Sequence, residues 1–541
     1  QRGQGGLERA LDLYRRYLDL FGDAAEAGYE LSYAYAQALK EGGFLDQAAG
    51  QYRRVAAHPA LGTHREEASY RRIQTLEVLF DADPSYLEEL VAAHEEYVSR
   101  NPSAALVPSI LFSEGELLLG AERFEQARGA FGRVLEAKPG HPLGPRALER
   151  IARCSFREAD YALSEAAMRR ALAEGLEEEL VAGARQLLAF AIFKQGEARE
   201  EAGDRVGANV HFSRLAEAFP EEDAAQVALY RVAENLRALG QEAEAARAYD
   251  RLARRYQGSE YARSALVLSS QIFASLGDWE DAARGFEDLY RGAPDAPEAA
   301  EALFRAARAM ERAGLREEAV ALFAEFAAAY AGEPRRAEAL FRQGELLRTL
   351  GRLEEAAERY RQTWESEGEG DAPSYRAQAA LALGRLALDR FRAVTLRGDL
   401  AAALGEKESF LGEALAQLAR AASLPYADTL TESLYRAGEA FEHLKAALLA
   451  SERPPDLTEE EREEYEFLLE EKAFPLEERA VSYYRNGVAA ARDAGVHTPW
   501  VDRMFERLEA LVPWAYQRNE EPAVAWNPAP PPPLQTAEGA L

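Results

Sequence analysis

The sequence predicts an all-α protein, built as a right-handed α-solenoid of repeated helix hairpins with a divergent helical C-terminal section and a Pro-rich tail. Two observations predict this fold class. Ala, Leu, Glu and Arg dominate the 541 residues, and these residue types favour helices over strands. A glycine also recurs with a period of 37 residues, and the positions of this hinge glycine are Gly203, Gly240, Gly277, Gly314 and Gly351. A fixed period over this length is typical of an array of stacked units.

The clearest copy of the repeat is the stretch LGDWEDAARGF at 276–286. Its apolar residues Trp279, Ala282, Phe286 and Leu289 are spaced three, four and three apart, which places them on one face of a helix. The small residue lets a neighbouring helix approach, and the aromatic residue fills the space beside it. The segment at 300–314 predicts a second amphipathic helix before the next hinge, so each unit is expected to be a helix hairpin.

Weaker copies of the same unit extend toward the N-terminus. They lie at 5–14, 43–52, 85–94, 122–131 and 159–168. About nine hairpins are therefore expected in a first region, residues 1–364. The spacings before Ser85 and after Ala159 are longer, which predicts extra residues in loops or longer helices there.

The regular spacing is lost after an acidic, Gly-containing linker at 365–374. A divergent helical section is expected at 375–516, in which an acidic insert at 454–475 separates the two helices of a degenerate repeat, 434–450 and 476–495. A Pro-rich tail follows at 517–541. The expected helices of the section are 375–395, 406–424, 427–450, 458–472, 475–495 and a capping helix at 499–511.

The run from Gly277 to Leu289, followed by Pro294, resembles the second helix of the tetratricopeptide repeat (TPR). The period of 37 departs from the usual value of about 34. The junctions at 254–266 and 217–229 are similar to those of exported bacterial TPR proteins, such as the periplasmic Tol-Pal coordinator and the TPR lipoprotein of the outer-membrane barrel-assembly machine. This resemblance implies a non-enzymatic scaffold in a complex of the bacterial cell envelope, periplasmic or associated with the outer membrane. A cytoplasmic assembly factor or co-chaperone is the alternative.

Composition argues against several other classes of function. The chain has 93 acidic and 64 basic residues, a net charge of -29 that is unlike that of nucleic-acid-binding proteins. The seven histidines show no metal-ligand spacing, and Cys154 has no partner motif, so we expect neither an enzyme nor a cofactor or metal site. The apolar stretches are too short and too interrupted by charge for a transmembrane segment.

The expected binding surface follows from the resemblance, which places the residue ten before each hinge on the inner, concave face of the array. These residues, here called the ladder, are Tyr33, Phe112, Phe193, Tyr230, Val267, Phe304 and Phe341. The residues four places further on are Glu197, Glu234, Gln271, Arg308 and Glu345. Aromatic and acidic side chains together suit an extended apolar or Pro-containing segment of another protein that can carry Arg or Lys. The alternative is that the ladder packs between units as core.

The Pro-rich tail is a second candidate for binding. Proline runs favour the polyproline II conformation, which aromatic grooves recognise. The residues expected to dock are Trp526, Pro530, Pro531, Pro532 and Pro533. The identity of the partner, the assembly and the oligomeric state are left open by the sequence.

Overall fold

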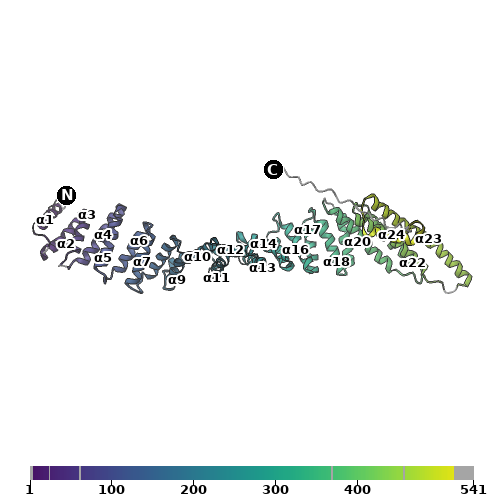
Figure 1. Ribbon diagram of the computed structural model, residues 1–541, viewed down its shortest axis with the longest axis horizontal. Helices are drawn as coiled ribbons and strands as arrows, with labels where there is room; N and C mark the ends of the chain where they lie inside the picture. The colour runs from purple at the N-terminus through teal and green to yellow at the C-terminus, as the bar shows by residue number, and fades with distance from the viewer. Residues whose placement is uncertain (1–3, 24, 60–61, 367–369, 455–456, 517–541) are drawn as a thin grey trace, which may run out of the picture. The chain divides into compact units, whose positions relative to one another are not determined.

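The computed structural model describes residues 4–23, 25–59, 62–366, 370–454 and 457–516, and it is an all-α solenoid of consecutively packed helices (Figure 1). The chain divides into two compact units, residues 1–269 and 270–541, and the division falls within α14. No strand occurs in the described parts of the chain. None of the described helices is long and apolar enough to span a membrane.

Nine helix hairpins follow a single N-terminal helix, α1 (Gln4–Phe21), along the described chain. The first helices of these hairpins are α2 (Glu26–Glu41), α4 (Arg65–Ala82), α6 (Val107–Gly120), α8 (Gly144–Arg157), α10 (Glu178–Glu201), α12 (Asp223–Ala238), α14 (Glu260–Leu276), α16 (Ala299–Ala313) and α18 (Arg336–Thr349). The second helices are α3 (Leu45–Ala56), α5 (Leu87–Arg100), α7 (Phe124–Ala137), α9 (Tyr161–Ala173), α11 (Arg205–Ala218), α13 (Glu242–Arg255), α15 (Trp279–Gly292), α17 (Arg316–Ala329) and α19 (Leu353–Glu365). A short 3-10 turn, η1 (Pro84–Tyr86), precedes α5, and the long spacing after Ala159 is taken up by the 24-residue α10.

In most hairpins the hinge between the two helices has a left-handed backbone. Gly277 and Gly314 have φ of 86° and 81°, values that glycine adopts without steric cost. In two of the weaker copies the hinge residue is Glu122 or Ala159, and these residues take φ of 59° and 61°. The turn geometry is therefore kept even where the glycine is lost.

The core of most hairpins is built around an aromatic residue of the second helix. Phe131, Phe212 and Tyr360 are fully buried, and each ring lies against a glycine of the first helix. A Cβ atom at Gly344, for example, would lie 2.6 Å from Cε1 of Tyr360. The small residue and the ring therefore set how closely the two helices pack.

The C-terminal section repeats this packing on longer helices. It contains α20 (Ala372–Ala393), α21 (Leu400–Ala422), α22 (Ala427–Leu449), α23 (Glu459–Asp493), α24 (Pro499–Leu511) and the short α25 (Pro513–Tyr516). Tyr484 of α23 is fully buried against Gly438 of α22, as in the N-terminal hairpins. Residues 427–493 therefore form one enlarged hairpin.

The expected separation of the helices 458–472 and 475–495 was wrong. α23 runs through Pro475 for 35 residues, so residues 459–475 of the acidic insert form the N-terminal half of one continuous helix. Proline inside a helix removes one backbone hydrogen-bond donor. Contacts in the part of α23 before Pro475 offset this cost. Thr458 and Glu461 form a capping box at the start of the helix, and Leu469 and Ala473 pack on Leu448.

Candidate functional site

The ladder residues lie on the first helices but differ in exposure. Tyr33 and Phe304 are buried, with 7% and 4% of their surface exposed. Phe112, Phe193, Tyr230, Val267 and Phe341 are half-buried. Only the half-buried members therefore present ring or side-chain surface that a partner can contact.

Each aromatic ladder ring packs on the core aromatic of its own hairpin. The ring centroids of Phe112 and Phe131 are 5.3 Å apart, and those of Tyr230 and Tyr249 are 5.6 Å apart. Several rings also contact the start of the next hairpin: Tyr33 stacks on His64, Tyr230 lies against Tyr261, Phe341 lies against Tyr375, and Phe304 lies under the guanidinium of Arg335. The ladder thus joins neighbouring hairpins, whatever else it binds.

The charged residues four places after the ladder are also engaged within the protein. Glu234 accepts a hydrogen bond from the Tyr249 hydroxyl, and Glu345 accepts one from the Tyr360 hydroxyl at 2.5 Å. Burial and the hydrogen bond to Glu345 raise the pKa of Tyr360, so this phenol stays protonated and donates. Glu197 pairs with Lys194 at 2.6 Å.

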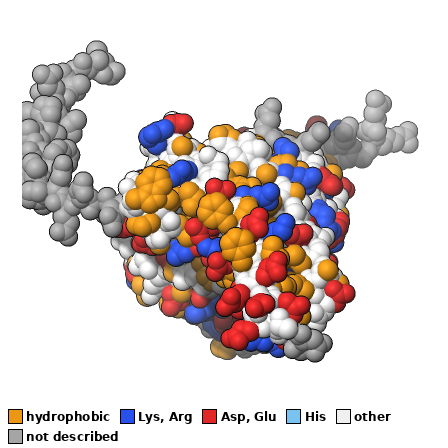
Figure 2. All heavy atoms as spheres, turned by 90° about the vertical axis from the view of Figure 1, so that its right-hand side faces the viewer, with side chains coloured by type: hydrophobic (Ala, Val, Ile, Leu, Met, Phe, Trp, Pro, Cys, Tyr) orange, Lys and Arg blue, Asp and Glu red, His pale blue; other side chains and the backbone are white. Residues whose placement is uncertain are grey.

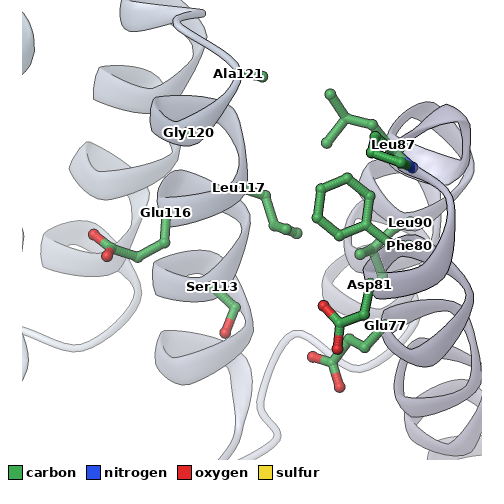
Figure 3. A pocket seen from close by; sticks show the side chains of 11 residues that line it. Glu77, Phe80, Asp81, Leu87, Leu90, Ser113, Glu116, Leu117, Gly120 and Ala121 are labelled. Atoms are coloured by element: carbon green, nitrogen blue, oxygen red, sulfur yellow. The ribbon is translucent and has the colours of Figure 1, made fainter.

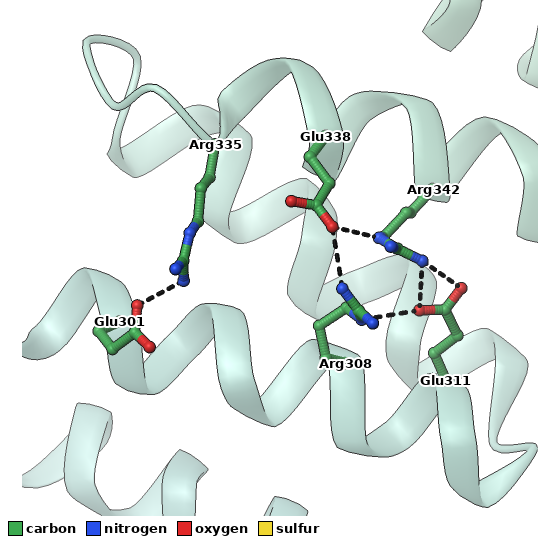
Figure 4. Close-up of polar contacts among 6 residues, drawn as sticks. All are labelled: Glu301, Arg308, Glu311, Arg335, Glu338 and Arg342. Atoms are coloured by element: carbon green, nitrogen blue, oxygen red, sulfur yellow. Dashed lines mark hydrogen bonds and ion pairs between the residues drawn. The ribbon is translucent and has the colours of Figure 1, made fainter. Parts of the chain in front are cut away.

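Arg308 belongs to an ion-pair network that connects α16 with α18 (Figure 4). Its guanidinium lies 2.9 Å from Glu338 and 3.4 Å from Glu311. Arg342 of α18 pairs with the same two carboxylates, at 2.7 Å and 3.3 Å. These partly buried charges hold neighbouring first helices together and leave Arg308 little freedom to bind a partner.

Some first helices of neighbouring hairpins contact each other directly. Within the first unit α10 contacts both α8 and α12, and within the second unit α20 contacts both α18 and α22. No two second helices of neighbouring hairpins make contact of this extent among the described residues. First helices therefore contact each other directly at these two places along the chain.

A hollow in the first unit lies between two first helices, α4 and α6, and is closed at one end by η1 and the start of α5 (Figure 3). We call it the cleft; its volume is about 730 Å³. Its apolar lining comes from Phe80, Leu87, Leu90 and Leu117. Figure 3 shows Phe80 and Leu117 pointing toward each other from opposite sides.

Two carboxylates lie side by side in the cleft, on Glu77 and Asp81 (Figure 3). Desolvation and the nearby Asp81 carboxylate raise the pKa of Glu77, against the opposing effect of Lys40. Neither carboxylate forms an ion pair with the described residues. A cation in the cleft would relieve this repulsion, so the electrostatics favour a ligand with Lys or Arg.

A third carboxylate of the cleft, Glu116, is turned toward the next hairpin. It accepts a 2.5 Å hydrogen bond from Arg150. Glu116 is four places after the ladder residue Phe112. The offset that selects Glu197 and Glu234 in later hairpins therefore also selects Glu116. Phe80 could not be found in this way, because it lies five places before Ser85, an offset that the count does not include.

The remaining candidates give no reaction chemistry. Cys154 is fully buried, and burial raises the pKa of its thiol to about 11, which keeps it protonated and unreactive. In the parts of the chain that the structure describes, no three His, Cys, Asp or Glu side chains are grouped as metal ligands. The tail residues Trp526 and Pro530 to Pro533 lie outside the described residues.

Comparisons with known proteins agree with the architecture. A family model described as tetratricopeptide repeat matches residues 190–222, 227–259, 301–332 and 338–366. These matches correspond to the end of α10 with α11, and to the hairpins α12–α13, α16–α17 and α18–α19. No curated protein sequence matches the chain significantly.

Several solved structures are similar at low identity. A tetratricopeptide repeat protein from Parabacteroides merdae is 15% identical, with 51% of this chain and 98% of that chain covered and a TM-score of 0.22. The human IFIT1 dimer with m7Gppp-AAAA is 16% identical, with 81% and 94% covered and a TM-score of 0.24. PilW, described as a type IV pilus biogenesis factor, is 18% identical, with 45% and 100% covered and a TM-score of 0.20. Scores this low carry no argument about function.

Proposed function

Because this chain belongs to the tetratricopeptide-repeat superfamily, we propose that it is a non-enzymatic scaffold that binds extended segments of other proteins along its first helices. Repeats of this kind stack only against their neighbours and create long surfaces rather than deep catalytic pockets. The described residues contain the hollow such a surface needs, the cleft between α4 and α6.

The observation that carries the proposal is the pairing of an apolar cleft with two carboxylates that form no ion pair with the described residues. Phe80 and Leu117 supply an apolar slot, and Glu77 with Asp81 supplies negative charge beside it. An extended segment in which an apolar residue alternates with Arg or Lys satisfies both features at once. The half-buried ladder residue Phe112 lies on α6, the same first helix that lines the cleft.

The proposed setting is the bacterial cell envelope, as a periplasmic or outer-membrane-associated subunit of a larger complex. Its support is the resemblance of the junctions at 217–229 and 254–266 to those of exported TPR proteins. Fractionation of the native cells with an antibody to the protein tests this setting. Recovery with cytoplasmic markers alone would instead favour the assembly factor or co-chaperone.

The binding proposal is tested with a labelled extended peptide that alternates Leu and Arg, and with a matched peptide that has Glu in place of Arg. The double variant Glu77→Gln/Asp81→Asn should weaken binding of the Arg peptide by about tenfold, since each lost contact to a charged group is worth roughly 1 kcal/mol or more. Fluorescence anisotropy measures both affinities. Equal binding of the two peptides by the unaltered protein would contradict the proposal.

A matched control separates the cleft from the general negative charge of the chain. Glu178 and Glu179 are exposed, adjacent carboxylates at the start of α10 in the same unit. The variant Glu178→Gln/Glu179→Gln changes the net charge equally and should bind the Arg peptide as the unaltered protein does. If both double variants lose affinity to the same extent, the cleft is not the site.

A further inference from the structure

The last long helix of the chain extends beyond the helix that caps it. α23 has 35 residues and α24 has 13, so their lengths are about 52 Å and about 20 Å. α24 lies on the C-terminal half of α23, where Met504 sits against Gly487. We call residues 459–475, the N-terminal half, the arm. The apolar core of the arm joins it to α22 alone, through Leu448, Leu469 and Ala473.

Three large apolar side chains of the arm are exposed and are not covered by any described part of the chain. Phe467, Leu468 and Phe474 are 67%, 47% and 60% exposed. Phe467 and Phe474 are seven residues apart, two helical turns, and therefore lie on the same side of the helix. Figure 2 views the molecule from this end and shows hydrophobic side chains at the surface among carboxylates. Large exposed aromatic side chains grouped in this way mark interaction surfaces.

The charge around this face is strongly negative. Between 459 and 475 the sequence has eight acidic and two basic residues, a net charge of -6. Glu463, Glu464, Glu470 and Glu471 flank the aromatic residues, and none of them forms an ion pair with the described residues. The occupant that complements this face is therefore basic.

Charge also argues against the two occupants that this chain could itself provide. A second copy carries a net charge of -29 and would place acidic surfaces together. The C-terminal tail at 517–541 has one basic and three acidic residues. Neither supplies the positive charge that the arm lacks.

We propose that the arm is a docking surface for a basic amphipathic helix of a partner protein. Two helices alone bury only a thin core here, and a third helix laid beside Phe467 and Phe474 would continue the stacking that builds the rest of the solenoid. Its apolar side would cover the aromatic residues, and its Lys and Arg side chains would pair with Glu470 and Glu471. This surface is separate from the cleft and belongs to the second unit.

The test uses the full chain and a synthetic amphipathic helical peptide with Leu on one face and Lys on the other. The variant Phe467→Ser/Phe474→Ser and the variant Glu470→Gln/Glu471→Gln should each weaken binding about tenfold or more, measured by calorimetry. All four side chains are exposed, so both variants should keep the circular dichroism of the unaltered protein. The matched control is Val206→Ser/Val210→Ser, an exposed apolar pair on α11, which should leave binding unchanged.

Several outcomes would overturn the proposal. The Leu-Lys peptide could fail to bind, or it could bind all variants with equal affinity. A peptide with Glu in place of Lys could also bind the unaltered protein with the same affinity as the Leu-Lys peptide. A dimer seen by light scattering that dissociates in Phe467→Ser/Phe474→Ser would show that a second copy covers the arm. Binding that appears only after truncation at residue 516 would show that the tail does.

Discussion

At the residue scale, His94 is a polar side chain buried in the core of a hairpin. It occupies the core position that Phe131 and Phe212 occupy in other hairpins, and it is fully buried. Neither ring nitrogen has a hydrogen-bond partner among the described residues. Burial lowers the pKa of His94 to about 4 from its usual 6.5, so the ring is neutral in the folded protein.

We predict that His94 makes the α4–α5 hairpin sensitive to acid. Between pH 6.5 and pH 4 the unfolded chain binds a proton at His94 that the folded protein does not, so stability falls as the pH falls through this range. The full loss is on the order of 3 kcal/mol. His94→Phe should remove this loss and also stabilise the hairpin at pH 7.5 by about 1 kcal/mol or more, because no polar group is left buried without a partner.

Hydrogen exchange of the α4 and α5 amides at pH 5 and pH 7.5 measures the effect, since repeat proteins open locally. His497 is exposed, and His497→Asn serves as the control that should leave the pH dependence of these amides unchanged. The same pH dependence in His94→Phe as in the unaltered protein would show that His94 is not its source.

At the scale of the helix hairpin, packing depends on the small residue opposite each core ring. A Cβ atom at Gly115 would lie 2.5 Å from Cε1 of Phe131, whereas one at Gly129, on α7 of the same hairpin, meets nothing within 4 Å. Both glycines lie inside helices, where alanine is favoured by about 1 kcal/mol. The two positions share the gain in helix propensity but differ in burial and in the space available for a Cβ atom.

Gly115→Ala and Gly129→Ala should therefore change the stability of the hairpin in opposite directions. Gly129→Ala should stabilise it by about 1 kcal/mol. Gly115→Ala gains the same helix propensity but forces Phe131 to move, an overpacking cost of about 1–3 kcal/mol that should dominate. Urea denaturation followed by circular dichroism gives both values. A stabilising Gly115→Ala would mean that Phe131 has room to shift.

Much of the hairpin architecture could be predicted because a local pattern encodes it. The spacing of Trp279, Ala282 and Phe286 reports one helix face, and α15 begins at Trp279 as that spacing indicates. The course of α23 through Pro475 could not be predicted, because packing on Leu448 and a capping box compensate for the lost donor. That the ladder binds a partner remains a prediction, because sequence spacing does not distinguish a residue that lines a groove from one that packs between hairpins.

The cleft was not predicted either, because sequence spacing alone does not report a hollow. It brings together Phe80 and Leu117, which are one period of 37 residues apart and lie five places before Ser85 and Glu122, an offset that the ladder count does not include. A repeat pattern shows which positions recur, but it does not show where neighbouring hairpins leave a hollow between them. Of the two carboxylates, Glu77 recurs as Glu114 one period later, whereas Asp81 corresponds to Leu118.

At the scale of the whole molecule, a net charge of -29 acts on any basic ligand before it reaches a specific site. Long-range attraction of this kind raises association rates and is screened by salt, whereas contacts within a site mainly set dissociation rates. The negative field of the chain and the carboxylates of the cleft should therefore affect different rate constants.

We predict that the association rate of the Leu-Arg peptide falls steeply with ionic strength, and by nearly the same factor for the unaltered protein and for Glu77→Gln/Asp81→Asn. Removing two of 93 acidic residues changes the long-range field little. The dissociation rate should rise about tenfold in the double variant alone, because only there is the bound cation left without its partners. Stopped-flow fluorescence at low and high salt measures both rates. A double variant that slows association and leaves dissociation unchanged would show that Glu77 and Asp81 attract the ligand without holding it.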